Sequence, residues 1–249
     1  MPLLECRGLV RRFGALVAVD RVDLAIEPGE IRAVIGPNGA GKSTVFNLIT
    51  STLKPQAGKV IFAGEELTGM PVHRVAQKGI ARTFQRCHVF PALTVRENVR
   101  IAAQARDGRR WRFVGGRPVL DSSGAVADEA LEQLRLTRHA GARADTLSHG
   151  DQRLLEIAMA LAQKPRLLML DEPTQGLSIE ETDRAVQILK SMLGRGNLSV
   201  LLVEHDMEVV FKLAHNITVL HRGRVIADGP PATVRADAEV RRAYLGEAG

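Results

Sequence analysis

Cysteine and aromatic residues are scarce in this chain of 249 residues. The cysteines, Cys6 and Cys87, stand in no metal-ligand spacing, which argues against a disulfide framework and favours a reduced, cytosolic protein. Aromatic residues make up only 4% of the chain, although hydrophobic residues together make up 45%. The core is therefore expected to consist of leucine, valine, isoleucine and alanine, and wholesale disorder is excluded.

Long apolar runs are also missing. No run reaches the roughly 18 residues that a membrane-spanning helix needs, and the first residues lack the basic and then apolar layout of a secretory signal. The formal net charge is +6, much of it in scattered arginines, and no motif of nucleic-acid-binding proteins occurs. We expect a solvated basic surface and no nucleic-acid partner.

Several short patterns predict β-strands. Residues 17–26 alternate between apolar and polar side chains, as in a half-buried strand, and apolar runs at 32–35, 167–170 and 198–203 predict buried strands. Helical patterns lie between these runs, which is typical of a parallel sheet covered on both faces. The last apolar segment predicts a hairpin that turns at Arg222-Gly223. The expected fold class is α/β, with a mainly parallel sheet.

The middle of the chain has a different texture. Helical patterns within residues 86–162 flank a stretch rich in glycine and arginine at 106–124. We expect this region to form a mainly helical subdomain inserted into the α/β core. No internal repeat occurs, so residues 1–249 are expected to form a single domain.

The segment GPNGAGKST matches the phosphate-loop pattern G-x-x-x-x-G-K-[ST]. Its residues are Gly36, Pro37, Asn38, Gly39, Ala40, Gly41, Lys42, Ser43 and Thr44. A helix is expected to begin near Gly41, so that backbone N–H groups and the helix dipole face one anion. We expect Lys42 to reach the β- and γ-phosphates of a nucleotide and Ser43 to ligate Mg²⁺. The motif alone does not say how the energy of the nucleotide is used.

Two acidic residues follow the apolar run at 167–170. If that run is a buried strand, Asp171 stands at its carboxyl end, beside the expected Mg²⁺. Glu172 lies one residue further, on the opposite side of the chain, where it can polarise water for attack on the γ-phosphate. A strand end that carries two solvated acids is the alternative.

Further motifs give the sequence a specific resemblance. LSHGDQ at 147–152 resembles the signature of ATP-binding-cassette (ABC) proteins, usually LSGGQ, and it precedes the acidic strand. Gln85 in ARTFQ matches the Q-loop of that family, His205 in LLVEHDM its switch histidine, and Phe13 in RRFG the aromatic residue that stacks on adenine. The resemblance spans almost the whole chain. It implies a phosphate-loop ATPase fold with an N-terminal antiparallel β part, and ATP with Mg²⁺ as its ligands.

The resemblance assigns a role to each matched residue. Phe13 and Val19 would contact ATP, with Phe13 stacked on the base, although Phe13 could also be a core residue. Gln85 would coordinate the metal ion or the attacking water through its amide oxygen. His205 would donate a hydrogen bond to the γ-phosphate, and a surface histidine is the alternative. The expected metal ligands are Ser43, Gln85 and Asp171. The expected catalytic set is Lys42, Gln85, Glu172 and His205.

The signature segment implies a dimer. Ser148, His149 and Gly150 open a helix whose N-terminus makes a second phosphate site, which in this family binds the ATP of the opposite subunit. Two cassettes would pack head-to-tail, either as two copies or with a related ATPase. Asp151 replaces the usual glutamine and is expected to face outward as a cap. Ser178 stands where many relatives have aspartate, which puts a contact across the dimer in question.

The resemblance also implies a task. The segments EHDM, VLHRGRVIADGPP and RRAYLGEAG resemble the ATPases of branched-chain amino-acid importers, and the signature is similar to that of urea and short-amide importers. Transmembrane permease subunits would dock near Gln85, where Val89, Phe90, Leu93 and Val95 are either groove lining or local core. A solute-binding protein outside the membrane would act indirectly, with the chain at the cytoplasmic face. A lipopolysaccharide-export ATPase and a non-transport ABC ATPase are the alternatives.

Overall fold

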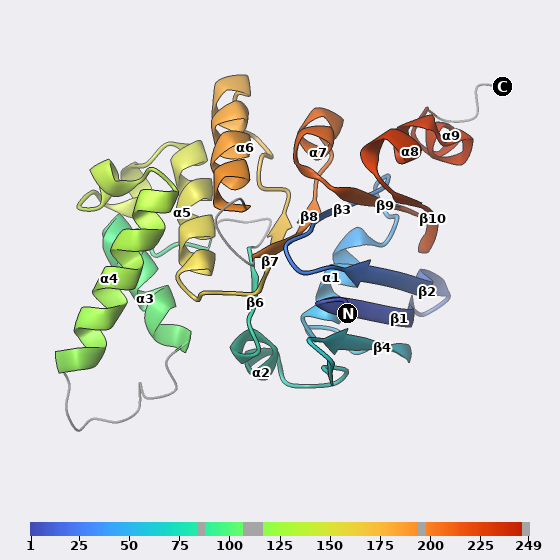
Figure 1. Cartoon of the computed structure of the whole chain (residues 1–249), viewed down its shortest axis with the longest axis horizontal. Helices are drawn as coiled ribbons and strands as arrows, with labels where there is room; N and C mark the ends of the chain where they lie inside the picture. Colours follow the sequence, from blue (N-terminus) through green and yellow to red (C-terminus); the bar gives the residue numbers. More distant parts are fainter. Residues whose placement is uncertain (84–87, 107–116, 194–197, 246–249) are drawn as a thin grey trace.

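Two β-sheets form the centre of the computed structural model, which describes residues 1–83, 88–106, 117–193 and 198–245 (Figure 1). The strands are β1 (Leu4–Phe13), β2 (Leu16–Ile26), β3 (Ile31–Ile35), β4 (Ala57–Phe62), β5 (Glu65–Glu66), β6 (Ile80–Arg82), β7 (Leu167–Asp171), β8 (Ser199–Val203), β9 (Asn216–His221) and β10 (Arg224–Gly229). The larger sheet has the order β10-β9-β3-β8-β7-β6, and the smaller sheet the order β2-β1-β4-β5.

The larger sheet is mainly parallel. All of its described pairings are parallel except that of β9 with β10, whereas β1, β2, β4 and β5 pair in an antiparallel manner. The α/β fold with an N-terminal antiparallel part is therefore confirmed. The strands predicted at 17–26, 32–35, 167–170 and 198–203 are β2, β3, β7 and β8, within one residue of their observed bounds.

The helices connect and cover these sheets. They are α1 (Lys42–Ile49), α2 (Val72–Gln77), α3 (Val95–Arg106), α4 (Arg117–Gln133), α5 (His149–Leu161), α6 (Ile179–Leu193), α7 (Met207–Leu213), α8 (Pro231–Ala236) and α9 (Ala238–Leu245), with 3-10 turns at Thr137–His139 and Ala144–Thr146. Figure 1 shows α3, α4 and α5 side by side at one end of the molecule, beyond β6 and β7. These three helices lie in the region expected to form the inserted helical subdomain.

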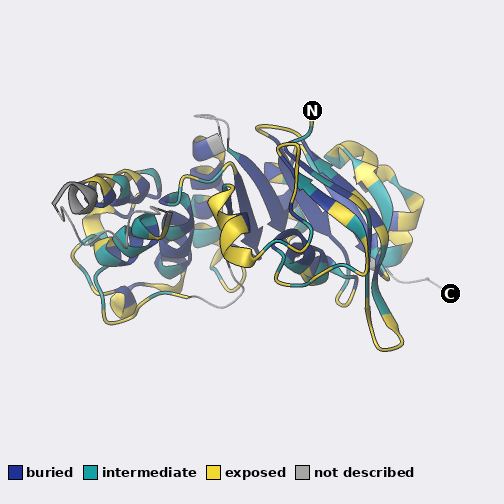
Figure 2. Cartoon of the chain, turned by 90° about the horizontal axis from the view of Figure 1, so that it is seen from below, coloured by how far each residue is buried: buried dark blue, intermediate teal, exposed yellow. Residues whose placement is uncertain are grey.

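The two faces of the larger sheet belong to different cores because successive strand residues alternate between faces. On β7, Leu167 and Met169 pack in a cluster with α1 and the antiparallel sheet, so α1 is held between the two sheets. Leu168 and Leu170 of the same strand pack in a second cluster with residues of α3, α4, α5 and α6. The cores therefore meet at β7, the strand that ends in the predicted acidic pair. Figure 2 shows the central strands as buried, with exposed residues mostly on loops and helix surfaces.

The predicted hairpin at the end of the sheet is confirmed. Strands β9 and β10 flank Arg222 and Gly223, which have φ values of 49° and 80°. Positive φ at both positions is the requirement of the two-residue turn that matches the twist of paired strands. Among the described residues, no helix combines the length and apolar character that crossing a membrane requires.

Candidate functional site

The phosphate loop lies at the carboxyl end of β3, whose five residues are all buried. Gly36 has φ 154° and Gly41 has φ 108°, and a Cβ atom on either would collide with a backbone carbonyl oxygen, that of Leu220 or Ala18. Only glycine therefore fits at these two positions without strain. Helix α1 begins directly after Gly41 without a side-chain cap, so the N–H groups of its first turn are available to an anion.

Lys42 is the first residue of α1, and its ammonium group reaches back to this loop. Its Nζ atom donates hydrogen bonds to the carbonyl oxygens of Gly36, at 2.6 Å, and Pro37, at 3.1 Å. Burial lowers the pKa of Lys42, while the nearby charges of Glu172 and Asp171 act in the opposite direction. The influence of these charges on Lys42 indicates that the acidic pair lies near the phosphate loop, as the sequence predicts. Ser43 is exposed, and its position at the start of α1 suits a metal-ligating hydroxyl.

Asp171 is the last residue of β7 and is 6% exposed. Arg82 at the end of the neighbouring strand donates from Nη2 to its Oδ2 atom at 2.9 Å, and from Nη1 to Asn47 of α1 at 2.6 Å. The alternative of solvated acids is therefore wrong. Carboxylate and hydroxyl oxygens are hard ligands that suit Mg²⁺, and Asp171 with Ser43 supplies both kinds. Nothing in the sequence signalled Arg82 as the partner that orients Asp171.

Glu172 follows β7 in an unusual backbone conformation, with φ 51°, and is 7% exposed. Its N–H donates to the carbonyl oxygen of Val203 at 2.9 Å, which extends the β7–β8 ladder by one bond. The Oε1 atom of Glu172 lies 2.6 Å from Nε2 of His205, directly beyond β8. The structure therefore brings together the residues predicted as catalytic base and switch histidine.

Buried Glu204 fixes the segment that carries His205. Its Oε2 atom accepts the N–H of His205 at 3.0 Å, and its Oε1 atom accepts both the N–H and the hydroxyl of Thr174, at 2.9 and 2.5 Å. Asp206 then caps α7 by accepting N–H groups of that helix. Thr174 follows the acidic pair by two residues, so Glu204 ties the ends of β7 and β8 together.

The signature residues open α5 as predicted. Ser148 is the N-cap, and its Oγ atom accepts the N–H of Asp151 at 3.1 Å. The same hydroxyl donates to Oε1 of Glu181 at 3.3 Å, and a Cβ atom on Gly150 would lie 2.5 Å from that oxygen. Glu181 was missed from the sequence, although Ser178 and Glu181 have the spacing of a capping box, a signal that could have located it.

Asp151 does not face outward, so that prediction is wrong. It is 7% exposed and pairs with Nη1 of Arg184 at 2.9 Å and with Nε2 of His139 at 3.5 Å. The cap position is already taken by Ser148, and the first turn of α5 packs on α6, where Arg184 offers a partner. An unpaired buried carboxylate would be costly, and this pairing offsets that cost. The ring of His149 lies against Gly176.

Phe13 and Val19, the residues predicted to contact ATP beyond the phosphate loop, lie in different environments. Phe13 is 43% exposed, with the Arg11 guanidinium 4.9 Å from its ring centroid, so the core alternative is wrong and its ring is accessible for stacking. Val19 is fully buried, which does not support a nucleotide contact through its side chain.

The residues predicted near the permease-docking groove differ in burial. Val95 is core, Val89 packs against the core and Phe90 is 47% exposed, so these residues divide between the alternatives of local core and groove lining. Gln85 lies outside the described residues.

Comparison with known proteins identifies the family. A family model described as ABC transporter matches residues 19–175, the span that holds the phosphate loop, the signature helix and the acidic pair. The chain belongs to the ABC transporter family. As an ABC protein it binds nucleotide and hydrolyses ATP. A second model, described as a branched-chain amino acid ATP-binding cassette transporter, matches residues 224–249.

Several curated relatives of this ABC protein match it over nearly their full length. The high-affinity branched-chain amino acid transport ATP-binding protein BraF of Pseudomonas aeruginosa is 42% identical over 99% of this chain and 99% of its own. The corresponding protein LivG of Escherichia coli is 40% identical with the same coverage. The lipopolysaccharide export system ATP-binding protein LptB of Haemophilus influenzae is 31% identical over 99% of this chain and 98% of its own.

Solved structures of ABC cassettes share the fold. A nucleotide-free ATP-binding cassette from an ABC transporter has a TM-score of 0.86 and 28% identity, over 99% of this chain and all of that one. A dimeric cassette in a post-hydrolysis state, bound to ADP and Pi, has a TM-score of 0.78 and 26% identity, over 92% of this chain and 98% of that one. The likeness covers both the sheets and the helical end of the ABC protein.

Proposed function

We propose that this ABC ATPase powers the import of branched-chain amino acids. The observation that carries the proposal is the near-complete match to two curated branched-chain amino acid transport ATP-binding proteins, at 42% and 40% identity. The match of residues 224–249 to a branched-chain-specific model supports it, because that segment lies outside the general ABC match. The working unit in this proposal is a dimer of cassettes bound to transmembrane permease subunits at the cytoplasmic face of the membrane.

ATP binding would use the exposed ring of Phe13 and the phosphate loop. Stacking of an aromatic ring on a base is worth about 1–3 kcal/mol in nucleic-acid complexes. The backbone N–H groups at the start of α1 and the ammonium of Lys42 would meet the phosphates, with Lys42 exchanging its carbonyl partners for phosphate oxygens. Ser43, Asp171 and Gln85 would hold Mg²⁺, which when bound would neutralise charge on the β- and γ-phosphates.

Hydrolysis would depend on Glu172 and His205. Glu172 would accept a proton from the attacking water, and general base catalysis contributes about 10²–10⁴-fold. His205 contacts the same carboxylate and can orient it or donate to the γ-phosphate. The order of β7 and β8 as neighbours in the sheet is what delivers both side chains to one edge.

The signature end of α5 would serve the ATP of the other subunit. Ser148 and Gly150 present a hydroxyl and a helix N-terminus, which suit a phosphate oxygen. Each site is then completed by its partner, so hydrolysis would require a closed dimer. Ser178 is engaged with Glu181 in its own chain, and the loss of the usual aspartate contact across the dimer remains a prediction.

Uptake measurements test the import proposal. In a strain that lacks the gene, accumulation of radiolabelled leucine, isoleucine and valine is expected to fall, and the wild-type gene but not a Glu172→Gln variant should restore it. Affinity purification from detergent-solubilised membranes should recover permease subunits with the tagged chain. Unchanged uptake together with recovery of lipopolysaccharide-export components would instead favour the exporter, which the 31% identity to an export ATPase supports as a second candidate.

A further inference from the structure

The backbone of Glu172 is held in a conformation that residues with side chains rarely adopt. Its φ of 51° lies in the left-handed region, which disfavours any residue but glycine. Its carbonyl oxygen accepts from the N–H of Gln175 at 3.2 Å and from Nη2 of Arg153 at 3.3 Å. The side chain of Arg153 therefore reaches from another element to the peptide group of the catalytic glutamate.

Arg153 belongs to α5, the helix that Ser148 and Gly150 open. It is 4% exposed, and its Nη1 atom donates to Oε2 of Glu156, one turn further along, at 2.7 Å. Glu156 is 6% exposed, and its Oε1 atom accepts the backbone N–H of His88 at 2.7 Å. His88 comes three residues after the predicted Q-loop glutamine, so this buried pair contacts the backbone of both Glu172 and a residue that follows the predicted Q-loop in the sequence.

A stabilising role alone does not account for this pair. Replacing a buried ion pair by apolar residues is often neutral or favourable, because removing two charges from water offsets most of their attraction. The neighbouring α5 positions Leu154, Leu155 and Ile157 are buried and apolar, so this helix packs well without charge. What an apolar pair could not provide is the set of directed hydrogen bonds to the backbone of Glu172 and His88.

We propose that Arg153 and Glu156 are positioning residues for ATP hydrolysis. They fix the peptide group of Glu172 and the backbone of His88 to the signature helix. A shift of α5, whose N-terminus is the predicted contact to the opposite ATP, then moves the catalytic glutamate of its own subunit. The inference rests on the proposed role of Glu172 as the base.

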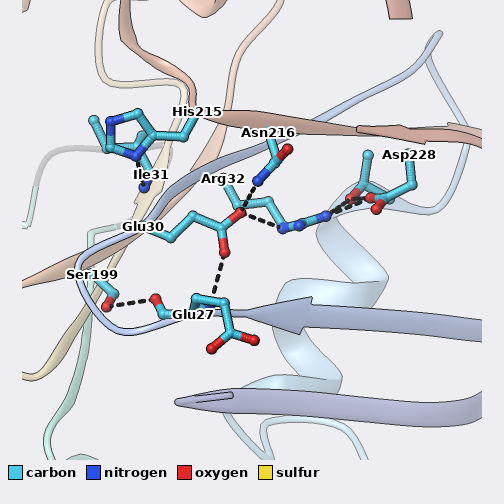
Figure 3. Close-up of polar contacts among 9 residues, drawn as sticks. Glu27, Glu30, Ile31, Arg32, Ser199, His215, Asn216 and Asp228 are labelled. Atoms are coloured by element: carbon cyan, nitrogen blue, oxygen red, sulfur yellow. Dashed lines mark hydrogen bonds and ion pairs between the residues drawn. The ribbon is translucent and has the colours of Figure 1, made fainter. Parts of the chain in front are cut away.

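A second buried ion pair in the same chain supplies a matched control (Figure 3). Glu30 is 6% exposed and accepts from Nε of Arg32 at 3.0 Å, from Nδ2 of Asn216 at 2.9 Å and from the N–H of Glu27 at 2.7 Å. It precedes β3, at the opposite end of that strand from the phosphate loop. Glu30→Gln therefore disturbs a buried charge network of similar kind without touching the site.

The experiment compares kcat, KM for ATP, ATP affinity and Tm among purified Arg153→Met, Arg153→Lys, Glu156→Gln and Glu30→Gln chains. We expect kcat to fall about 10- to 100-fold in Arg153→Met, the loss that a small misplacement of a catalytic group causes, with ATP affinity within about twofold. Arg153→Lys keeps the charge, but its single ammonium cannot reach both Glu156 and the carbonyl oxygen of Glu172. Its kcat should therefore lie between those of the wild type and Arg153→Met. Glu30→Gln should lower Tm and leave kcat within about twofold of wild type.

The outcomes separate the inference from the proposal that it rests on. If Arg153→Met changes kcat no more than Glu30→Gln does at a similar loss of Tm, Arg153 does not position the base. If Arg153→Met does not fold, Glu156→Gln, which keeps the shape of the side chain, decides in the same way. A Glu172→Gln chain that still turns over would instead remove the role of Glu172, whatever the Arg153 variants show.

Discussion

The Nε2 atom of His205 lies 2.6 Å from Oε1 of Glu172, so the two side chains form one hydrogen-bonded unit. The contact arises because β7 and β8 are neighbouring strands whose register pairs Asp171 with Val203. Glu172 follows Asp171 directly, and His205 lies two residues after Val203. Glu172 is nearly buried, whereas 43% of the His205 side chain is exposed. The Glu172 carboxylate is therefore fixed in the protein interior, and His205 reaches from it to the surface.

Replacing each member of this unit should separate binding from turnover. Glu172→Gln is expected to reduce kcat by about 10²–10⁴-fold, because an amide cannot accept the proton of the attacking water. His205→Ala should lower kcat by a smaller factor, since the carboxylate remains but loses its orienting partner. Phosphate release and equilibrium ATP binding are the measurements. Loss of ATP binding in Glu172→Gln would contradict the assignment, because the side chain would then be needed for binding.

Lys42→Met should remove nucleotide binding without lowering the stability of the nucleotide-free chain. Burial lowers the pKa of Lys42 from 10.5, so its charged form opposes folding at every pH below the lowered pKa, and this cost disappears as the pH rises past 10.5. Methionine removes the buried charge, which offsets the lost hydrogen bonds to Gly36 and Pro37. ATP at about 100 times its Kd should stabilise the wild type by about 2.7 kcal/mol and the variant not at all.

Thermal unfolding with and without ATP measures both effects. If the nucleotide-free Lys42→Met chain unfolds at a temperature well below that of the wild type, the hydrogen bonds of the ammonium to Gly36 and Pro37 stabilise the fold by more than its burial costs. A retained thermal shift with ATP would show that Lys42 is not needed for the nucleotide.

The capping box at the start of α6 should contribute to stability in a pH-dependent manner. Ser178 accepts the N–H of Glu181 at 3.2 Å, and Glu181 accepts the N–H of Ser178 at 3.1 Å. Ser178→Ala should therefore cost about 1 kcal/mol in the free energy of unfolding. The bond from the Ser178 N–H lowers the pKa of Glu181 below 4.5, so its charge stabilises the fold above that pH.

Denaturation in urea across pH provides the test. The difference in unfolding free energy between wild type and Glu181→Gln should be present at neutral pH and lost as the pH falls below 4.5 through the lowered pKa. A difference that grows on acidification would show that Glu181 opposes folding when charged.

Cys6 should be unreactive until the chain unfolds. Its side chain is 1% exposed, and burial raises the pKa of the thiol to about 12, so the reactive thiolate is scarce at neutral pH. In a Cys87→Ser background, iodoacetamide should label Cys6 only as urea unfolds the chain. Rapid labelling of the native chain would show that the antiparallel sheet opens locally.

Features that depend on local sequence were predictable from it. The phosphate loop needs glycine where φ is positive, the hairpin needs a turn at Arg222 and Gly223, and β7 shows its burial as an apolar run. Each of these constraints acts between residues close in the chain, so the order of side chains contains it. The fold class follows because alternating strands and helices leave few right-handed arrangements.

Side-chain partners across the fold were not predictable. Arg82 and Asp171 are 89 residues apart in the sequence, and Arg184 and Asp151 are 33 residues apart, so neither pair forms a motif that a single sequence displays. Asp151 was expected to face solvent because an acid at a helix start is ordinarily a cap, but the packing of α5 on α6 buried it beside a cation. The family resemblance predicts that Val19 contacts the nucleotide, whereas the alternation of side chains along β2 points Val19 into the core.

Gly150→Ala should impair the signature end of α5, at a cost in stability similar to that of Ser178→Ala. A methyl group there would lie 2.5 Å from Oε1 of Glu181, so the Glu181 carboxylate must leave its capping contacts with Ser178. The same methyl would project where the phosphate of the opposite ATP is proposed to bind, so turnover should fall about tenfold or more while monomer ATP affinity is unchanged. Gly141→Ala is the matched control, because no atom lies within 4 Å of its added Cβ. Kinetics and ATP-dependent dimerisation by light scattering check both variants, and an ATP-bound Gly150→Ala dimer as stable as wild type would place the opposite phosphate elsewhere.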